Sequence, residues 1–172
     1  APPGSWYDSG TVVDVNATVN EGYSWVGWSG DLSGTTRPTS ITMSGPRSVT
    51  ANFGREVQIT ITTNPAGLNF TVDGTSYSSA QTFTWVENSS HDLSVNSPQS
   101  GVAGTRYVYA SWSNGGAQSH SYTVPSSDVT VTAHFTTQYQ LTVNSTHGNP
   151  QGAGWYDSGI SADFSVSSPD VQ

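Results

Sequence analysis

The residues best suited to chemistry are the acids of a recurring aromatic segment. Trp6-Tyr-Asp-Ser-Gly10 returns unchanged as Trp155-Tyr-Asp-Ser-Gly159, and a weaker copy, Trp85-Val-Glu-Asn-Ser, lies between them. A mechanism with paired carboxylates would need a second acid at a defined distance from the first. Here one acid recurs per copy, as turn residues do, because Asp and Asn stabilise turns by hydrogen-bonding their own backbone. The acids that we predict to be turn residues are Asp8, Glu87 and Asp157.

The other chemistry-bearing residues do not gather in the sequence. The four histidines lack the H-x-x-x-H or H-E-x-x-H spacing of metal sites, and no D-x-D-x-D run offers calcium its oxygen ligands. No G-x-S-x-G segment presents a nucleophilic serine, and there is no Cys and no Lys. Asp31 is a lone loop acid. We therefore predict a protein that is not an enzyme, with no catalytic residue, metal site or cofactor.

The charge of the chain excludes two classes of partner. The net charge is −8 and the only basic residues besides histidine are four arginines, which argues against nucleic-acid binding and against an anionic membrane surface. No apolar run approaches the roughly 18 residues of a membrane-spanning helix. Any secretory leader is expected to have been removed before Ala1. Four N-x-S/T sequons are glycosylation candidates, although chance also produces such triplets in a Ser- and Thr-rich chain: Asn16, Asn69, Asn88 and Asn144.

Three further sequence blocks each occur twice in the chain. They are GYSWVGWSG (22–30) with RYVYASWSN (106–114), SVTANF (48–53) with TVTAHF (130–135), and VQITITTNPAG (57–67) with YQLTVNSTHGN (139–149). Internal repetition of this kind implies stacked supersecondary units. We predict a partial repeat lacking its first strand (1–53), a complete central repeat with an inserted hairpin (54–138), and a partial repeat holding only the early strands (139–172).

The local signals all indicate strands and turns. Apolar and polar residues alternate, with many β-branched side chains, in 57–63, 129–135 and 140–144. Asp73-Gly74 between Phe70-Thr-Val72 and Thr75-Ser-Tyr77 predicts a hairpin with a two-residue turn, and Asn114-Gly115-Gly116 predicts another turn. No stretch shows a helical period. We therefore expect an all-β chain of tandem, small antiparallel-sheet units, elongated in shape.

The repeated blocks also resemble a known family. The residues that carry the resemblance are Trp6–Gly10, the Gly22–Gly30 block with its G-W-S-G ending, and Met43, Val49, Ala51 and Phe53. The chain resembles the divergent internalin-type B-repeat, or bacterial repeat domain, of bacterial and archaeal surface proteins. The resemblance implies a β-grasp-like sheet in a non-catalytic, secreted module of the cell surface. The central unit departs from the family pattern in having S-W-S-N at 111–114 and Val124 in place of Met.

Two kinds of tryptophan have different expected roles. Trp28 and Trp112 recur within alternating strands, so we favour core packing over a sugar-stacking platform. Trp6 and Trp155 alternate with tyrosines before a turn, so one aromatic of each pair should face outward. We favour packing against a neighbouring repeat for these exposed aromatics, with carbohydrate binding as the alternative.

The incomplete ends suggest how copies could join. The segment containing Tyr139, Leu141 and Val143 is a first strand of the type that residues 1–53 lack. A sheet that lacks a strand recruits one from elsewhere, either from the same chain or from another copy. We favour completion between copies, which gives a head-to-tail filament. The sequence thus favours an extracellular spacer, stalk or filament subunit, with copies of itself or neighbouring repeats as partners. The alternative is an adhesin or carbohydrate-binding appendage that recognises surface glycans.

Overall fold

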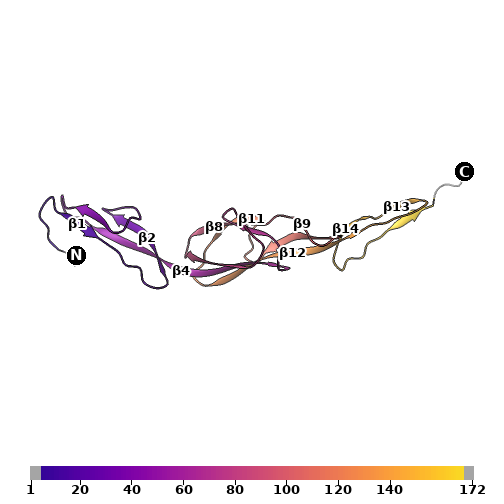
Figure 1. Ribbon diagram of the computed structural model, residues 1–172, viewed down its shortest axis with the longest axis horizontal. Coiled ribbons are helices and arrows are strands. Elements are labelled where there is room, and N and C mark those ends of the chain that lie inside the picture. Colours follow the sequence, from indigo (N-terminus) through magenta and orange to yellow (C-terminus); the bar gives the residue numbers. More distant parts are fainter. Residues whose placement is uncertain (1–4, 169–172) are drawn as a thin grey trace. The chain divides into compact units, whose positions relative to one another are not determined.

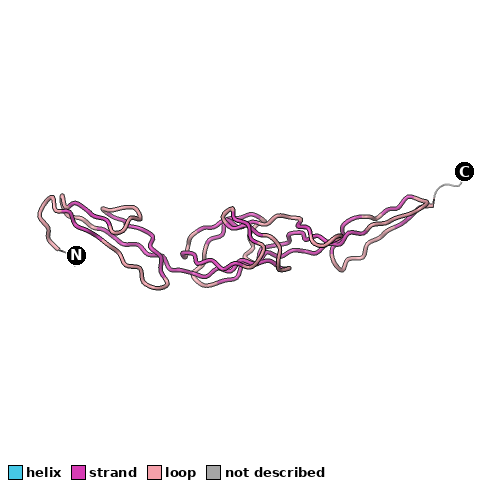
Figure 2. The backbone as a smooth tube through the Cα atoms, viewed as in Figure 1, coloured by secondary structure: helices cyan, strands magenta, loops and turns pink. Residues whose placement is uncertain are grey.

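The computed structural model describes residues 5–168, which consist of strands, turns and loops without a helix (Figure 2). The chain therefore has the all-β class that the alternating sequence pattern predicts. It divides into two compact units. Unit 1 is the described part of Ala1–Gln58 together with Thr84–Ser89 and Val124–Asp128. Unit 2 is the described part of Ile59–Phe83, Ser90–Thr123 and Val129–Gln172.

Unit 1 contains two antiparallel strand pairs, β1 with β3 and β2 with β4 (Figure 1). Their bounds are β1 (Val12–Val15), β2 (Tyr23–Gly30), β3 (Thr39–Thr42) and β4 (Val49–Asn64). Trp25 lies opposite Phe53 and Trp28 lies opposite Ala51, with a bulge between Trp25 and Gly27. A bulge places two residues of one strand against one residue of its partner.

Unit 2 holds the second half of β4, which pairs in parallel with β12, and β12 pairs antiparallel with β10. A second sheet has the order β11-β8-β5-β6, and β8 and β11 lie side by side in Figure 1. Its hairpin β5–β6 turns at Asp73 and Gly74, both with positive φ, which confirms the predicted two-residue turn. The strands so far are β5 (Phe70–Val72), β6 (Thr75–Tyr77), β8 (Ser90–Ser94), β10 (Thr105–Trp112), β11 (Ser119–Thr123) and β12 (Val129–Leu141).

Five further strands complete the pairings. β9 pairs with β10, β7 with β4, β14 with β12, and β13 with β15. Their bounds are β7 (Gln81–Val86), β9 (Gln99–Ser100), β13 (Asn149–Gln151), β14 (Gly154–Asp157) and β15 (Ser165–Ser167). The predicted strand over 140–144 is only partly present, because β12 ends at Leu141.

The β10–β12 ladder repeats the β2–β4 ladder residue for residue. Tyr109 lies opposite Phe135 and Trp112 opposite Ala133, again with a bulge two residues before the tryptophan. A backbone hydrogen bond made by the turn after the aromatic segment also recurs. The amide of Gly10 donates to the carbonyl of Met43 at 2.8 Å, and the amide of Asn88 donates to that of Val124 at 2.9 Å. Residues 49–53 of β4 therefore correspond to residues 131–135 of β12.

The turn after the aromatic segment has the same geometry in all three copies, but the middle copy is displaced by one residue. Asn88 has the positive φ that Gly10 and Gly159 have, because Asn tolerates the left-handed conformation. Val86, not Glu87, therefore takes the place of the aspartates, so the predicted equivalence of Glu87 is wrong by one position. The closing hydrogen bonds run from Thr11 N to Asp8 O, Ser89 N to Val86 O and Ile160 N to Asp157 O.

Candidate functional site

The backbone of β4 in unit 1 presents its two sides to different surroundings. The carbonyl of Ser48 accepts a hydrogen bond from the amide of Asp31 at 2.8 Å, and the amide of Glu56 donates to the carbonyl of Gly22 at 2.9 Å. Backbone polar groups alternate in direction along an extended strand. The even-numbered residues 48–56 therefore turn their N–H and C=O groups toward β2, and the odd-numbered residues turn theirs away.

The side of β4 that faces away from β2 is only partly covered. The carbonyl of Arg55 accepts a hydrogen bond from the amide of Glu87 at 2.8 Å, one residue beyond the end of β7. Among residues 5–168, no strand pairs with the backbone of Val49, Ala51 and Phe53 on this side. We call these three backbone positions the acceptor edge. Unpaired edges of this kind template the addition of another strand.

A hollow of about 340 Å³, lined by both polar and apolar side chains, adjoins the acceptor edge. Side chains of β1, β2, β3 and β4 and of the adjoining loops form it, and Val49 belongs to both the hollow and the acceptor edge. Its lining consists of Ser5, Tyr7, Val13, Asp14, Val15, Asn16, Trp28, Ile41, Met43, Arg47 and Val49.

Burial shows that the inner face of unit 1 lacks a layer that its counterpart in unit 2 has. Phe53 is 39% exposed, whereas the corresponding Phe135 is 9% exposed. In unit 2 the strand that covers β12 is the second half of β4, whose Ile59 and Ile61 are completely buried. The hollow adjoins the acceptor edge at Val49, which corresponds to the buried Val131 of unit 2. Trp28 and Trp112 are both buried, which confirms their predicted core role.

Ion pairing fixes the start of β4 next to the acceptor edge. The Asp31 carboxylate accepts a hydrogen bond from the amide of Ser48 at 2.7 Å and another from the Arg47 guanidinium at 3.0 Å. The Ser48 hydrogen bond first, and the Arg47 guanidinium second, hold the pKa of Asp31 below its usual value. This anchors the chain where β4 begins without occupying the acceptor edge, since both contacts are made on the β2 side.

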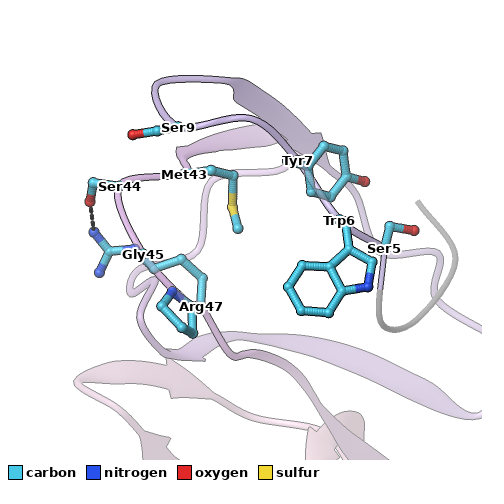
Figure 3. Close-up of a pocket in the computed structure, with 9 residues that line it drawn as sticks. Ser5, Trp6, Tyr7, Ser9, Met43, Ser44, Gly45 and Arg47 are labelled. Carbon is cyan, nitrogen blue, oxygen red and sulfur yellow. Dashed lines mark hydrogen bonds between the residues drawn. The ribbon is translucent and has the colours of Figure 1, made fainter.

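The two tryptophans predicted as exposed contacts have different surroundings. Trp6 is completely exposed and borders a hollow of about 490 Å³. Figure 3 shows the side chain of Met43 pointing into this hollow, between Trp6 and the turn that carries Arg47. Trp155, in β14 of unit 2, is partly buried and carries the Arg106 guanidinium 4.5 Å from its ring centroid. Of these two repeated tryptophans, Trp6 is therefore the exposed one. The ring of Trp155 is engaged in a cation–π contact with Arg106.

The predicted strand-completion segment lies at the end of β12. Tyr139 and Leu141 belong to β12, where Gln138–Leu141 pairs with β14, and Val143 follows the strand. Tyr139 is exposed, and Leu141 and Val143 are half-buried. The four sequon asparagines, Asn16, Asn69, Asn88 and Asn144, are all exposed, and their glycosylation stays a prediction.

The acidic and histidine side chains of the described residues are scattered. Within residues 5–168, no group of three or more His, Asp or Glu side chains could hold a metal ion. Asp8 and Asp157 lie in turns, as predicted, but it is their backbone carbonyls that accept the closing hydrogen bonds, and the Asp157 carboxylate accepts from the Gln138 side chain. Residues 5–168 contain no helix that is long and apolar enough to cross a membrane.

Comparison with known families decides the relationship of the N-terminal part. Residues 2–57 match the family described as the divergent InlB B-repeat domain. This segment is similar to the divergent InlB B-repeat domain over about a third of the chain. The match confirms the resemblance seen in the sequence, and the family is a repeat domain of bacterial surface proteins. The matched segment includes β1, β2, β3 and the acceptor edge. Comparisons with curated proteins and with solved structures give no significant match.

The sequence alone did not locate the acceptor edge within the matched segment. It indicated a missing first strand, but the side of β4 left open depends on the alternation of backbone groups relative to β2. The signal that could have located it is the correspondence between SVTANF (48–53) and TVTAHF (130–135), because the second of these segments pairs with a parallel strand.

Proposed function

We propose that the chain is a non-catalytic, extracellular structural repeat of a cell-surface protein, acting as a spacer, stalk or filament subunit. Its tandem units, at 1–53, 54–138 and 139–172, are small antiparallel sheets of β-grasp-like type, and copies join head to tail by strand completion. The observation that carries the proposal is the recurrence of one ladder with its bulge, Trp25 to Trp28 on β2 and Tyr109 to Trp112 on β10.

Two further observations support a structural role. The matched family consists of repeat domains of bacterial surface proteins. In addition, unit 1 presents a strand edge without a partner strand among residues 5–168, with a hollow beside it, and such an edge suits pairing with another strand. Repeat proteins gain stability from each unit and from its neighbours, so such arrays extend by adding units.

The spacer role is tested by lengthening the chain. A variant carrying residues 57–138 twice should fold and should show a larger maximum dimension in small-angle X-ray scattering, because an added unit extends an array. The control is the same variant with Trp112→Ala in the added unit, which should lose the compact extra length. A duplicated chain that collapses to the original dimension, or that fails to fold its second copy, would contradict the spacer role.

Carbohydrate binding at Trp6 is the second candidate function. A fully exposed indole beside a hollow of about 490 Å³ is the kind of surface on which a sugar ring stacks. Tryptophan fluorescence and a glycan array test this directly. Trp6→Ala should abolish binding and its repeat counterpart Trp155→Ala should preserve it. Equal binding by wild type and Trp6→Ala would exclude this site.

A further inference from the structure

We propose that the acceptor edge of one copy binds residues 141–146 of a second copy as a parallel strand, in a single register. The proposal rests on the proposed function, and it names the partner, the two surfaces and their alignment. The equivalence between residues 49–53 of β4 and residues 131–135 of β12 carries the first step, because the corresponding edge of β12 is covered in this structure.

The covered edge shows which side of the strand receives its partner. The amide of Ser113 donates to the carbonyl of Thr132 at 2.9 Å, so the even-numbered residues of β12 face β10 there. The backbone N–H and C=O groups of the odd-numbered residues Val129, Val131 and Ala133 therefore point toward β4. Their equivalents in unit 1 are the odd-numbered residues, including Val49 and Ala51 of the acceptor edge. The open side of unit 1 is thus the same side that is filled in unit 2.

The register follows from the same equivalence. In unit 2, Val131 lies opposite Ile61 and Thr132 lies opposite Thr62. The repeated blocks place Val143 where Ile61 lies and Asn144 where Thr62 lies. The full alignment is Arg47 with Leu141, Ser48 with Thr142, Val49 with Val143, Thr50 with Asn144, Ala51 with Ser145 and Asn52 with Thr146.

The side chains of the donor segment suit the acceptor. Leu141 and Val143 correspond to Ile59 and Ile61, which are completely buried in unit 2. In the proposed register they lie on the same face as Val49, which lines the hollow of about 340 Å³ together with Val13, Trp28 and Ile41. Burying two such aliphatic side chains removes apolar surface that both copies otherwise expose to water. The polar Thr142 and Asn144 lie on the opposite face, where their present exposure is retained.

The donor segment is also available for pairing. β12 ends at Leu141, and among residues 5–168 no strand pairs with residues 142–146. Its equivalents 60–64 are in β4, where they pair with β12. The same sequence pattern therefore forms a strand in 60–64, where a partner strand is present, and forms none in 142–146, where no partner strand is present. A second copy would supply the missing partner to both surfaces at once.

The contact explains the complete exposure of Trp6. When the donor segment of one copy completes unit 1 of the next, the assembled unit contains the aromatic segment twice, as Trp155–Gly159 of the donor and as Trp6–Gly10 of the acceptor. Only one of these two segments can pair with the donor's β12. The donor's copy already does so through β14, and the acceptor's Trp6 lies outside any strand. Because the acceptor edge and the donor segment are different surfaces, the contact is head to tail and continues from copy to copy.

Cysteine cross-linking tests the register, since the chain has no native cysteine. Thr50→Cys and Asn144→Cys proteins are purified separately, mixed and oxidised. The expected product is a disulfide-linked heterodimer, formed at least tenfold more than with either protein alone. The control replaces Asn144→Cys by Thr142→Cys. A shift of two residues separates the Cα atoms by about 8 Å, beyond the reach of a disulfide, so this pair should not cross-link.

Two outcomes would overturn the proposal. One is a mixture in which the Thr142→Cys control cross-links as well as Asn144→Cys. The other is a Thr50→Cys/Asn144→Cys double variant that forms only cross-linked monomers at every concentration, since this would show closure within one chain. Neither outcome alters the scattering result for the duplicated chain, so failure of the inferred contact is distinguishable from failure of the spacer role.

Discussion

Trp28 and Trp112 occupy the same place in two copies of one ladder, yet their surroundings differ. Each indole N–H donates to a backbone carbonyl, Trp28 to Thr36 at 3.0 Å and Trp112 to Gln118 at 3.4 Å. Both rings are buried, but the hollow lined by Trp28 leaves unit 1 less completely packed. The indole of Trp28 is thus buried like that of Trp112, but it also lines a hollow.

Truncating either tryptophan should unfold its own surroundings and spare the other copy. Trp28→Ala and Trp112→Ala should each cost about 3–5 kcal/mol locally, because a large buried side chain is lost and its partner carbonyl is left unpaired. Thermal melts combined with amide NMR spectra measure this. Trp6→Ala, which removes a fully exposed ring, is the control and should leave the Tm unchanged. A shift of Tm below about 1 °C for Trp28→Ala would contradict its core role.

Acid should unfold the protein only at low pH. The pKa of Asp31 is lowered first by the Ser48 amide and then by Arg47, and that of Asp73 first by His91 and then by the Asp92 amide. A carboxylate whose folded pKa lies below its unfolded value of 3.8 stabilises the fold above that pH and loses this effect as the pH falls through the folded pKa. Far-UV circular dichroism should therefore stay native to about pH 3. Cooperative loss of signal between pH 5 and 4 would refute this expectation.

The end of β2 depends on a glycine for two separate reasons. Gly30 has a φ of +91°, and a Cβ there would lie 2.4 Å from the carbonyl oxygen of Ser48. Gly34 has nearly the same φ, +92°, but nothing within 4 Å of a Cβ. Gly34→Ala should cost about 1 kcal/mol for the left-handed backbone alone.

Gly30→Ala should destabilise unit 1 by clearly more than Gly34→Ala, since the rigid backbone at the start of β4 must also move. Urea unfolding of the two variants, followed by tryptophan fluorescence, measures the difference. Equal midpoints would show that the close approach to Ser48 has no energetic consequence.

At the level of the element, the sequence predicted strands best where a partner strand is present. The alternation in 57–63 and 129–135 gave correct strands, and Asp73-Gly74 gave the correct hairpin turn. The alternation in 140–144 is just as regular, but the strand ends at Leu141, because extended backbone needs hydrogen-bond partners that sequence pattern alone does not supply. The predicted turn acid Glu87 lies one residue away from the position of the aspartates, because in the middle copy the left-handed turn residue is Asn88, only three residues after Trp85.

For the whole molecule, assembly should change the backbone protection of one short segment. Even-numbered residues of β4 in unit 1 already face β2, whereas the amides of Val49, Ala51 and Phe53 have no strand opposite them among the described residues. The N–H groups of these three residues point away from β2, to the side where no described strand pairs with them, so in the dilute monomer they should exchange hydrogen as an open edge does, and those of Thr50 and Asn52 should be protected. Association should protect the odd-numbered set as protein concentration rises, with little change in the even-numbered set.

Deleting residues 139–172 should abolish this concentration dependence, because the donor segment is lost while the acceptor edge remains. Adding a peptide of residues 137–147 to the truncated chain should restore protection at Val49, Ala51 and Phe53 and raise the stability of unit 1 by mass action, with peptide in excess over its Kd. The control peptide carries Leu141→Asp and Val143→Asp, which keeps the backbone but replaces the two aliphatic side chains on the face of Val49 by charges, and should not bind. Hydrogen exchange with residue resolution provides the measurement. Protection of the odd-numbered amides in the truncated chain without peptide, or equal protection by both peptides, would refute strand completion at this edge.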